Sequence, residues 1–144
     1  MERELVSVCG LYCGICPIHE ATNDRALAEK IASRRGNKLE DVHCAGCRAE
    51  KGIIPIMGPA ICQTYDCSVN RKKVEFCFQC DEFPCLKLAP CADRANEIPN
   101  NMKIYNLLLI QKNGLEKWLK EAENIQRIYC RGKKKRGGDE PILE

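Results

Sequence analysis

The chain has 144 residues, a formal net charge of +3 and twelve cysteines. Its length predicts one domain, and it contains neither a secretory leader nor an apolar run near the roughly 18 residues of a membrane span. The sequence therefore predicts a cytoplasmic protein without a membrane partner. In that compartment thiols stay reduced, and clustered cysteines bind metal more often than they form disulfides.

The first motif is the run VCGLYCGICPIH, residues 8–19, in which Cys9, Cys13 and Cys16 have the spacing C-x3-C-x2-C. Radical S-adenosylmethionine enzymes hold an iron–sulfur cluster with this spacing. They build it onto an α/β barrel, however, and a full barrel needs about 250 residues. No train of apolar strands alternating with helices follows here, so we interpret the match as a local coincidence of spacing.

Helix signals follow the first motif. A helix is predicted over about 24–35, with Asn23 as its N-cap and Gly36 just past its end. Prolines and a glycine predict a loop over 53–60. A short helix is predicted over 63–74, and a helical turn over 84–90.

The C-terminal third carries the strongest helical pattern. A helix is predicted over about 102–112 and ends at Gly114. A second helix is predicted over 115–129, where apolar residues recur at helical spacing, and we interpret this stripe as core packing. From residue 131 onward the chain is polar, glycine-rich and charged, so we expect disorder.

No sustained β-alternation is present. The predicted fold class is mainly α, with a small α+β arrangement as the alternative and with irregular cysteine-rich loops stapled by metal. The predicted organisation is a single cysteine-rich metal-binding domain over 1–130 and a basic tail over 131–144.

Ten cysteines fall into four closely spaced units and are the predicted metal ligands: Cys9, Cys13, Cys16, Cys44, Cys47, Cys62, Cys67, Cys77, Cys80 and Cys85. A C-x2-C turn places two thiolates on one side of a tight loop, and two such turns supply the four-thiolate tetrahedron that zinc prefers. Iron–sulfur clusters accept the same ligands. Zinc is therefore the expected metal, a 4Fe-4S cluster is the alternative, and disulfides or redox-active thiols remain open.

The spacing also predicts how the units group. A short spacer costs less loop-closure entropy, so Cys44 and Cys47 are expected to share one site with Cys62 and Cys67. The first and fourth units, Cys9 through Cys16 and Cys77 through Cys85, are then expected to share another. Cys91 and Cys130 stand apart.

The sequence offers little for catalysis. It holds two histidines, His19 and His43, which are weak candidates for metal ligands. No Ser/His/Asp set, paired-carboxylate set or glycine-rich phosphate loop is visible, so the expectation leans away from an enzyme.

Three kinds of function remain. The favoured one is a zinc-binding structural or interaction module. The others are an iron–sulfur protein in electron transfer or redox sensing, and a zinc-knuckle nucleic-acid binder that uses the basic run Lys133–Arg136. Because residues 1–130 hold 18 basic and 17 acidic side chains, the core lacks a basic stripe. A protein partner is therefore expected rather than a nucleic acid.

Together the four units resemble the family of small cysteine-rich bacterial and archaeal proteins catalogued as domain of unknown function 3795. The likeness covers about residues 8–90, and the run NLLLIQKNGLEKWL extends it toward residue 120. It is carried by Cys9, Gly10, Leu11, Cys13, Cys16, Cys44, Gly46, Cys47, Cys62, Cys67, Cys77, Cys80, Phe83, Pro84, Cys85, Lys87 and Leu88. The resemblance implies metal binding, commonly supposed to be zinc, and no established activity. Some members end in a cysteine pair, of which this chain keeps only Cys130.

Overall fold

The computed structural model describes residues 3–88 and 102–131. Within these ranges the chain forms helices and helical turns, and the only β-type pairings are two isolated bridges, Val6↔Tyr12 and Ile53↔Ile61. The predicted mainly helical class is thus confirmed, and the α+β alternative finds no strand among the described residues. The tail over 131–144 lies almost wholly outside them.

Most elements before residue 89 are single turns. The 3₁₀ turns are η1 (Arg3–Leu5), η2 (Cys13–Ile15), η3 (Leu39–Asp41), η4 (Pro55–Met57), η6 (Cys77–Gln79) and η7 (Leu86–Leu88). The predicted turn over 84–90 corresponds to η7, and the predicted loop over 53–60 contains η4. Such short elements bury little on their own, so the contacts between them must hold this half together.

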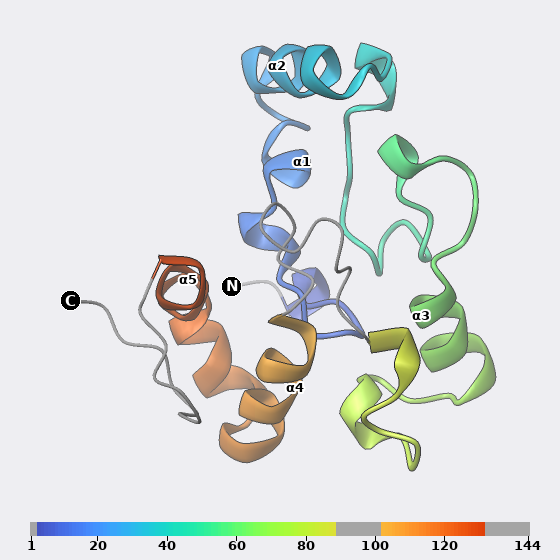
Figure 1. Ribbon diagram of the computed structural model, residues 1–144, viewed down its shortest axis with the longest axis vertical. Coiled ribbons are helices and arrows are strands. Elements are labelled where there is room, and N and C mark those ends of the chain that lie inside the picture. Colours follow the sequence, from blue (N-terminus) through green and yellow to red (C-terminus); the bar gives the residue numbers. More distant parts are fainter. Residues whose placement is uncertain (1–2, 89–101, 132–144) are drawn as a thin grey trace.

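Helices α1 (Pro17–Glu20) and α2 (Arg25–Arg35) stand at one end of the molecule, away from the C-terminal helices (Figure 1). The extent of α2 confirms the helix predicted over 24–35, but its N-cap is Asp24, whose carboxylate accepts from the Leu27 N–H at 3.0 Å. Gly36 ends the helix in the left-handed region, as expected. The small core of this end consists of Ala21, Ala28, Ala32, Val42 and Ile56.

Helix α3 (Gln63–Tyr65) continues into the π-helix η5 (Asp66–Arg71). The Lys72 N–H donates to the Cys67 carbonyl at 2.8 Å, five residues back, so the turn is wider than the ordinary helix predicted over 63–74. The ring of Tyr65 covers Gly52, where an added Cβ would come within 2.6 Å of that ring. Gly52 also has a φ of +82°, so both space and backbone conformation call for glycine here.

Helices α4 (Met102–Asn113) and α5 (Leu115–Arg131) confirm the two predicted C-terminal helices. Gly114 joins them with a φ of +82°, and its N–H donates to the Ile110 carbonyl at 2.8 Å. They pack on each other and on the N-terminal half around one core: Val6, Cys9, Phe76, Leu88, Leu107, Ile110, Trp118, Leu119 and Ala122. The Asn106 side-chain amide donates to the Gly10 carbonyl at 2.7 Å and ties α4 to the first cysteine unit.

Arg48 braces the centre of the molecule. Its guanidinium donates to the Val6 carbonyl at 2.7 Å and to the Glu75 carbonyl at 2.8 Å. It also lies over the Phe76 ring, 5.0 Å from the ring centroid. The residue directly after Cys47 thus connects the N-terminal segment to the approach to Cys77.

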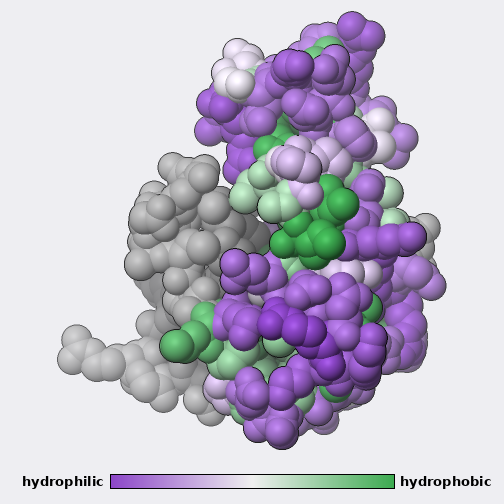
Figure 2. All heavy atoms as spheres, turned by 90° about the vertical axis from the view of Figure 1, so that its right-hand side faces the viewer, coloured by the Kyte–Doolittle hydropathy of each residue, from purple (hydrophilic) through white to green (hydrophobic). Residues whose placement is uncertain are grey.

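Exposed apolar residues gather on the segment 53–61, which contains η4 and leads to α3. Ile53, Met57 and Ile61 are exposed there, and Figure 2 shows an apolar area on this side of the molecule between hydrophilic surfaces. None of the helices that the structure describes is both long enough and apolar enough to cross a membrane.

Candidate metal centres

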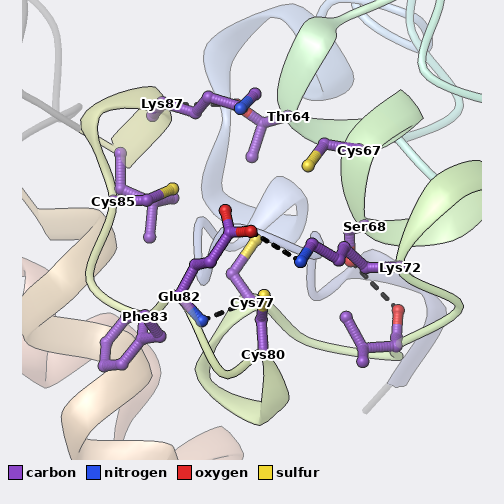
Figure 3. Close-up of a pocket in the computed structure, with 12 residues that line it drawn as sticks. Thr64, Cys67, Ser68, Lys72, Cys77, Cys80, Glu82, Phe83, Cys85 and Lys87 are labelled. Atoms are coloured by element: carbon purple, nitrogen blue, oxygen red, sulfur yellow. Dashed lines mark hydrogen bonds and ion pairs between the residues drawn. The ribbon is translucent and has the colours of Figure 1, made fainter.

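A small cavity separates the π-helix η5 from the loop that follows η6. Its volume is about 20 Å³, and four cysteines line it: Cys67, Cys77, Cys80 and Cys85. Figure 3 shows their sulfurs turned toward the same space from three directions. We call these four residues the pocket cluster.

Backbone hydrogen bonds fix three of the four positions. The Cys77 N–H donates to the Val8 carbonyl at 2.9 Å, which anchors η6 on the N-terminal segment. The Cys80 N–H closes the C-x2-C turn onto the Cys77 carbonyl at 3.1 Å, and the Glu82 N–H points at Cys80 Sγ at 3.5 Å. The Leu88 N–H donates to the Cys85 carbonyl at 3.0 Å.

The fourth position depends on the π-helix. The widened turn places Cys67 over the cavity and Ser68 beside Cys77, and the Ser68 hydroxyl donates to the Val74 carbonyl at 3.0 Å. Thr64 donates to the Lys87 carbonyl at 3.3 Å, which ties α3 to η7 across the cavity. Polar contacts therefore join the two walls of the pocket cluster.

Charge surrounds the pocket cluster. The Lys72 ammonium lies 2.7 Å from Glu82 Oε1 and 3.3 Å from Asp81 Oδ1. These carboxylates raise the pKa of Lys72, and the hydrogen bond to Glu82 is the largest cause. Burial raises the pKa of the Cys77 thiol to about 12, although the neighbouring Ser68 hydroxyl acts in the opposite direction. Cys77 therefore stays protonated at neutral pH unless a cation compensates for its burial.

A second group of thiols lies at two C-x2-C turns that are far apart in the sequence. These thiols lie within electrostatic reach of one another: in addition to burial, which is the largest cause, Cys16 and Cys44 raise the pKa of Cys13, Cys16 raises that of Cys44, and Cys13 raises that of Cys47. Cys9 contributes in the same direction to Cys13 and Cys47. We call Cys13, Cys16, Cys44 and Cys47 the turn cluster. Gly46 separates the last two, with a φ of +102°, and a Cβ at this position would lie 3.9 Å from Cys13 Sγ.

Helix α1 holds one of these turns against the other. The Cys44 carbonyl accepts from His19 Nδ1 at 2.7 Å and from the Thr22 hydroxyl at 3.3 Å, while the Cys44 N–H donates to Thr22 Oγ1 at 3.0 Å. His19 thus positions a candidate ligand through the backbone. His43 points elsewhere and bonds the Glu40 carbonyl at 2.8 Å.

Burial dominates the thiol chemistry of the turn cluster. It raises the pKa of Cys13 to about 11 and raises the pKa values of Cys44 and Cys47 as well. Backbone N–H groups oppose this rise, because the Gly46 N–H points at Cys44 Sγ at 3.4 Å and the Cys47 N–H faces the Cys13 sulfur. Donors aimed at sulfur stabilise the thiolate over the thiol.

Two of the ten candidate ligands fall outside both clusters. Cys9 is buried in the main core, with its Sγ 3.1 Å from Ser7 Oγ, and Cys62 precedes α3 near Cys47. All ten are free thiols. Cys91 and the side chain of Cys130 lie outside what the structure describes.

The arrangement of the units in the structure differs from the predicted grouping at two places. Cys44 and Cys47 face the first unit, and Cys67 faces the fourth. Two neighbours agree with the predicted grouping, because Cys62 lies near Cys47 and Cys9 lies near Cys77. The prediction relied on the number of residues between the units. The segment between Cys16 and Cys44 is folded into α1 and α2, so Cys44 lies back near Cys16.

Within residues 3–88 and 102–131, no three His, Cys, Asp or Glu side chains already stand at the mutual distances of a metal centre. The donor sets nevertheless suit zinc, since each cluster supplies four sulfurs, and the Glu82 carboxylate that also lines the pocket is paired with Lys72.

Comparison with protein families matches residues 5–90 to the family described as "Protein of unknown function (DUF3795)". No curated protein and no solved structure shows a significant match to the chain.

Proposed function

The chain belongs to the DUF3795 family of proteins of unknown function, and we propose that it is a zinc-binding structural module whose metal centre is the pocket cluster. The observation that carries the proposal is the convergence of four free thiols on one small cavity. Four cysteine sulfurs are the donor set of a closed structural zinc site.

The size of the cavity favours a single ion over an iron–sulfur cluster. A cavity of 10–15 Å³ holds roughly one water-sized sphere, and this cavity measures about 20 Å³. A 4Fe-4S cluster brings four irons and four sulfides and would have to push the walls apart. A single zinc ion occupies far less space, and binding it requires the four sulfurs to move to ligand distance.

A backbone donor at the pocket cluster also suits a bound ion. Four thiolates and one Zn²⁺ carry a net charge of −2, whereas the Lys72 ammonium at the edge of the cavity is already paired with the Glu82 and Asp81 carboxylates. The Glu82 N–H points at Cys80 Sγ at 3.5 Å, and a donor aimed at a ligand sulfur offsets part of the charge that zinc leaves uncompensated.

Bound zinc would supply folding free energy. The pocket cluster joins η5, η6 and η7, which are single turns that bury little apolar surface by themselves. With all four sulfurs used as ligands, no position remains open for a substrate, so the role is structural. We further propose that the protein works in a reducing compartment and contacts a protein partner.

The test is metal analysis of the purified full chain, with acid-labile sulfide measured on the same sample. We expect bound zinc, no sulfide and a colourless protein. Substitution Cys77→Ser should remove one zinc per chain, whereas the control Cys62→Ser should remove none, because Cys62 lies outside the cavity. A brown protein with stoichiometric sulfide would instead establish an iron–sulfur cluster.

A further inference from the structure

We infer that the turn cluster is a second, independent zinc centre, and that it clasps the α1–α2 segment where this segment leaves and rejoins the rest of the molecule. The inference rests on the proposed function only in requiring that reduced cysteines of this chain bind zinc. It assigns a different ligand set and a different structural task.

The position of the turn cluster supports this task. Cys13 and Cys16 directly precede α1, and Cys44 and Cys47 follow the chain's return from α2. Figure 1 shows the two helices at one end of the molecule, with the chain rising into α1 and descending again after α2. Residues 17–43 are thus bracketed by the two C-x2-C turns.

The α1–α2 segment needs such a clasp. Three of the five buried residues in its core are alanines, which bury little apolar area. Helix α2 has 11 residues, and an isolated helix of that length is marginal in water. A bound ion between the two turns would close this segment with free energy that its own core does not provide.

The local chemistry is built for sulfur ligands. His19 and Thr22 hold the backbone of Cys44, and N–H groups of the second turn face the sulfurs of Cys44 and Cys13. Two facing C-x2-C turns provide four thiolates in the spacing pattern of structural zinc sites.

The centre is independent of the pocket cluster because the two share no ligand. Cys9 lies between them, interacting with Cys13, Cys47 and Cys77, but its side chain is packed in the main core. Cys62 lies near Cys47 but belongs to neither cluster, so Cys62→Ser tests whether a nearby cysteine that is not a proposed ligand affects zinc binding.

The experiment measures zinc per chain and hydrogen exchange on the full-length zinc protein and its variants. Wild type should bind two zinc ions. Cys44→Ser and Cys16→Ser should each retain one, and exchange of the amides over 17–43 should rise at least about tenfold while α4 and α5 keep their protection. Cys77→Ser should also retain one zinc but leave 17–43 protected, and Cys62→Ser should match wild type.

Titration of the reduced wild-type protein with Co²⁺ counts the centres without using variants that fold poorly. The thiolate charge-transfer band should saturate at two equivalents. If Cys16→Ser and Cys44→Ser both keep two zinc ions, the second centre is wrong and the proposed function stands. If either loses all zinc, a single shared site replaces two independent ones. A reduced wild-type protein that binds no zinc at all would overturn the proposed function itself.

Discussion

Arg48 shows how one side chain can join segments that the cysteine motifs alone do not connect. It reaches the Val6 and Glu75 carbonyls and covers the Phe76 ring. Val6 is fully buried, so its carbonyl would lose its partner without the guanidinium. The sequence showed only an arginine after a cysteine, and nothing in the local pattern indicated these long-range acceptors.

We expect Arg48→Ala to lower the free energy of unfolding of the zinc protein by about 2–4 kcal/mol, because a buried acceptor is left unsatisfied and a charge-assisted bond is lost. Arg48→Lys should recover less than half, since an ammonium cannot reproduce the two-pronged geometry. Arg25→Ala, which breaks the exposed pair with Glu29, should cost under about 0.5 kcal/mol. Urea denaturation measures the free energy of unfolding of all three variants. Equal losses for Arg48→Ala and Arg25→Ala would show that the Arg48 contacts do not stabilise the fold.

At the scale of elements, helix positions were predictable and their details were not. The boundaries of α2, α4 and α5 follow from helical periodicity and from Gly36 and Gly114. The cap of α2 was misplaced by one residue, because Asn23 and Asp24 are both good caps and only the extended backbone of Asp24 decides between them. The π-helix was not predictable, since no local sequence signal distinguishes it from an ordinary helix over the same residues.

The cap of α2 gives a matched pair of variants. Asp24→Ala removes the acceptor of the Leu27 N–H and should lower stability by about 1 kcal/mol. Asn23→Ala should change it by less than about 0.3 kcal/mol, because its side chain does not cap the helix. Thermal unfolding of the zinc protein distinguishes the two, and a larger loss for Asn23→Ala would move the cap back to the predicted residue.

At the scale of the whole molecule, spacing nominates the candidate ligands but does not predict which of them lie near one another. The first and second units are separated by 27 residues, counted between Cys16 and Cys44, and loop-closure cost favoured closer pairs. Two helices occupy that interval and return the chain to α1, where His19 and Thr22 hold Cys44. Loop entropy treats the interval as flexible, and this one is folded.

The affinity of the proposed zinc centres should fall steeply as the pH falls. Burial raises the pKa of Cys13 to about 11 and that of Cys77 to about 12, so zinc must displace protons from its thiols at neutral pH. Lowering the pH from 8 to 7 should weaken binding by up to about 10⁴-fold per centre, one factor of ten for each of four thiols. The direction is the same if the metal-free chain unfolds, since an ordinary thiol pKa of about 8.5 also lies above this range.

Competition with a chelator, corrected for the chelator's own protonation, measures this slope at pH 6, 7 and 8. Cys62→Ser should leave it unchanged. A flat profile would mean that the thiolates exist before the metal arrives, and would contradict the burial of both clusters.

The hydrogen bonds between α1 and Cys44 have a further consequence for how this chain can change over evolution. They bring the two ends of the α1–α2 segment together. The middle of this segment contacts the rest of the molecule mainly where Asn37 and its neighbours pack on η4. A segment with adjoining ends can be lengthened, shortened or replaced at little entropic cost to its host. Residues 24–42, which leave His19 and Thr22 in place, are thus the natural place for relatives to differ in size, and for an engineer to graft a foreign helical hairpin between two cysteine turns.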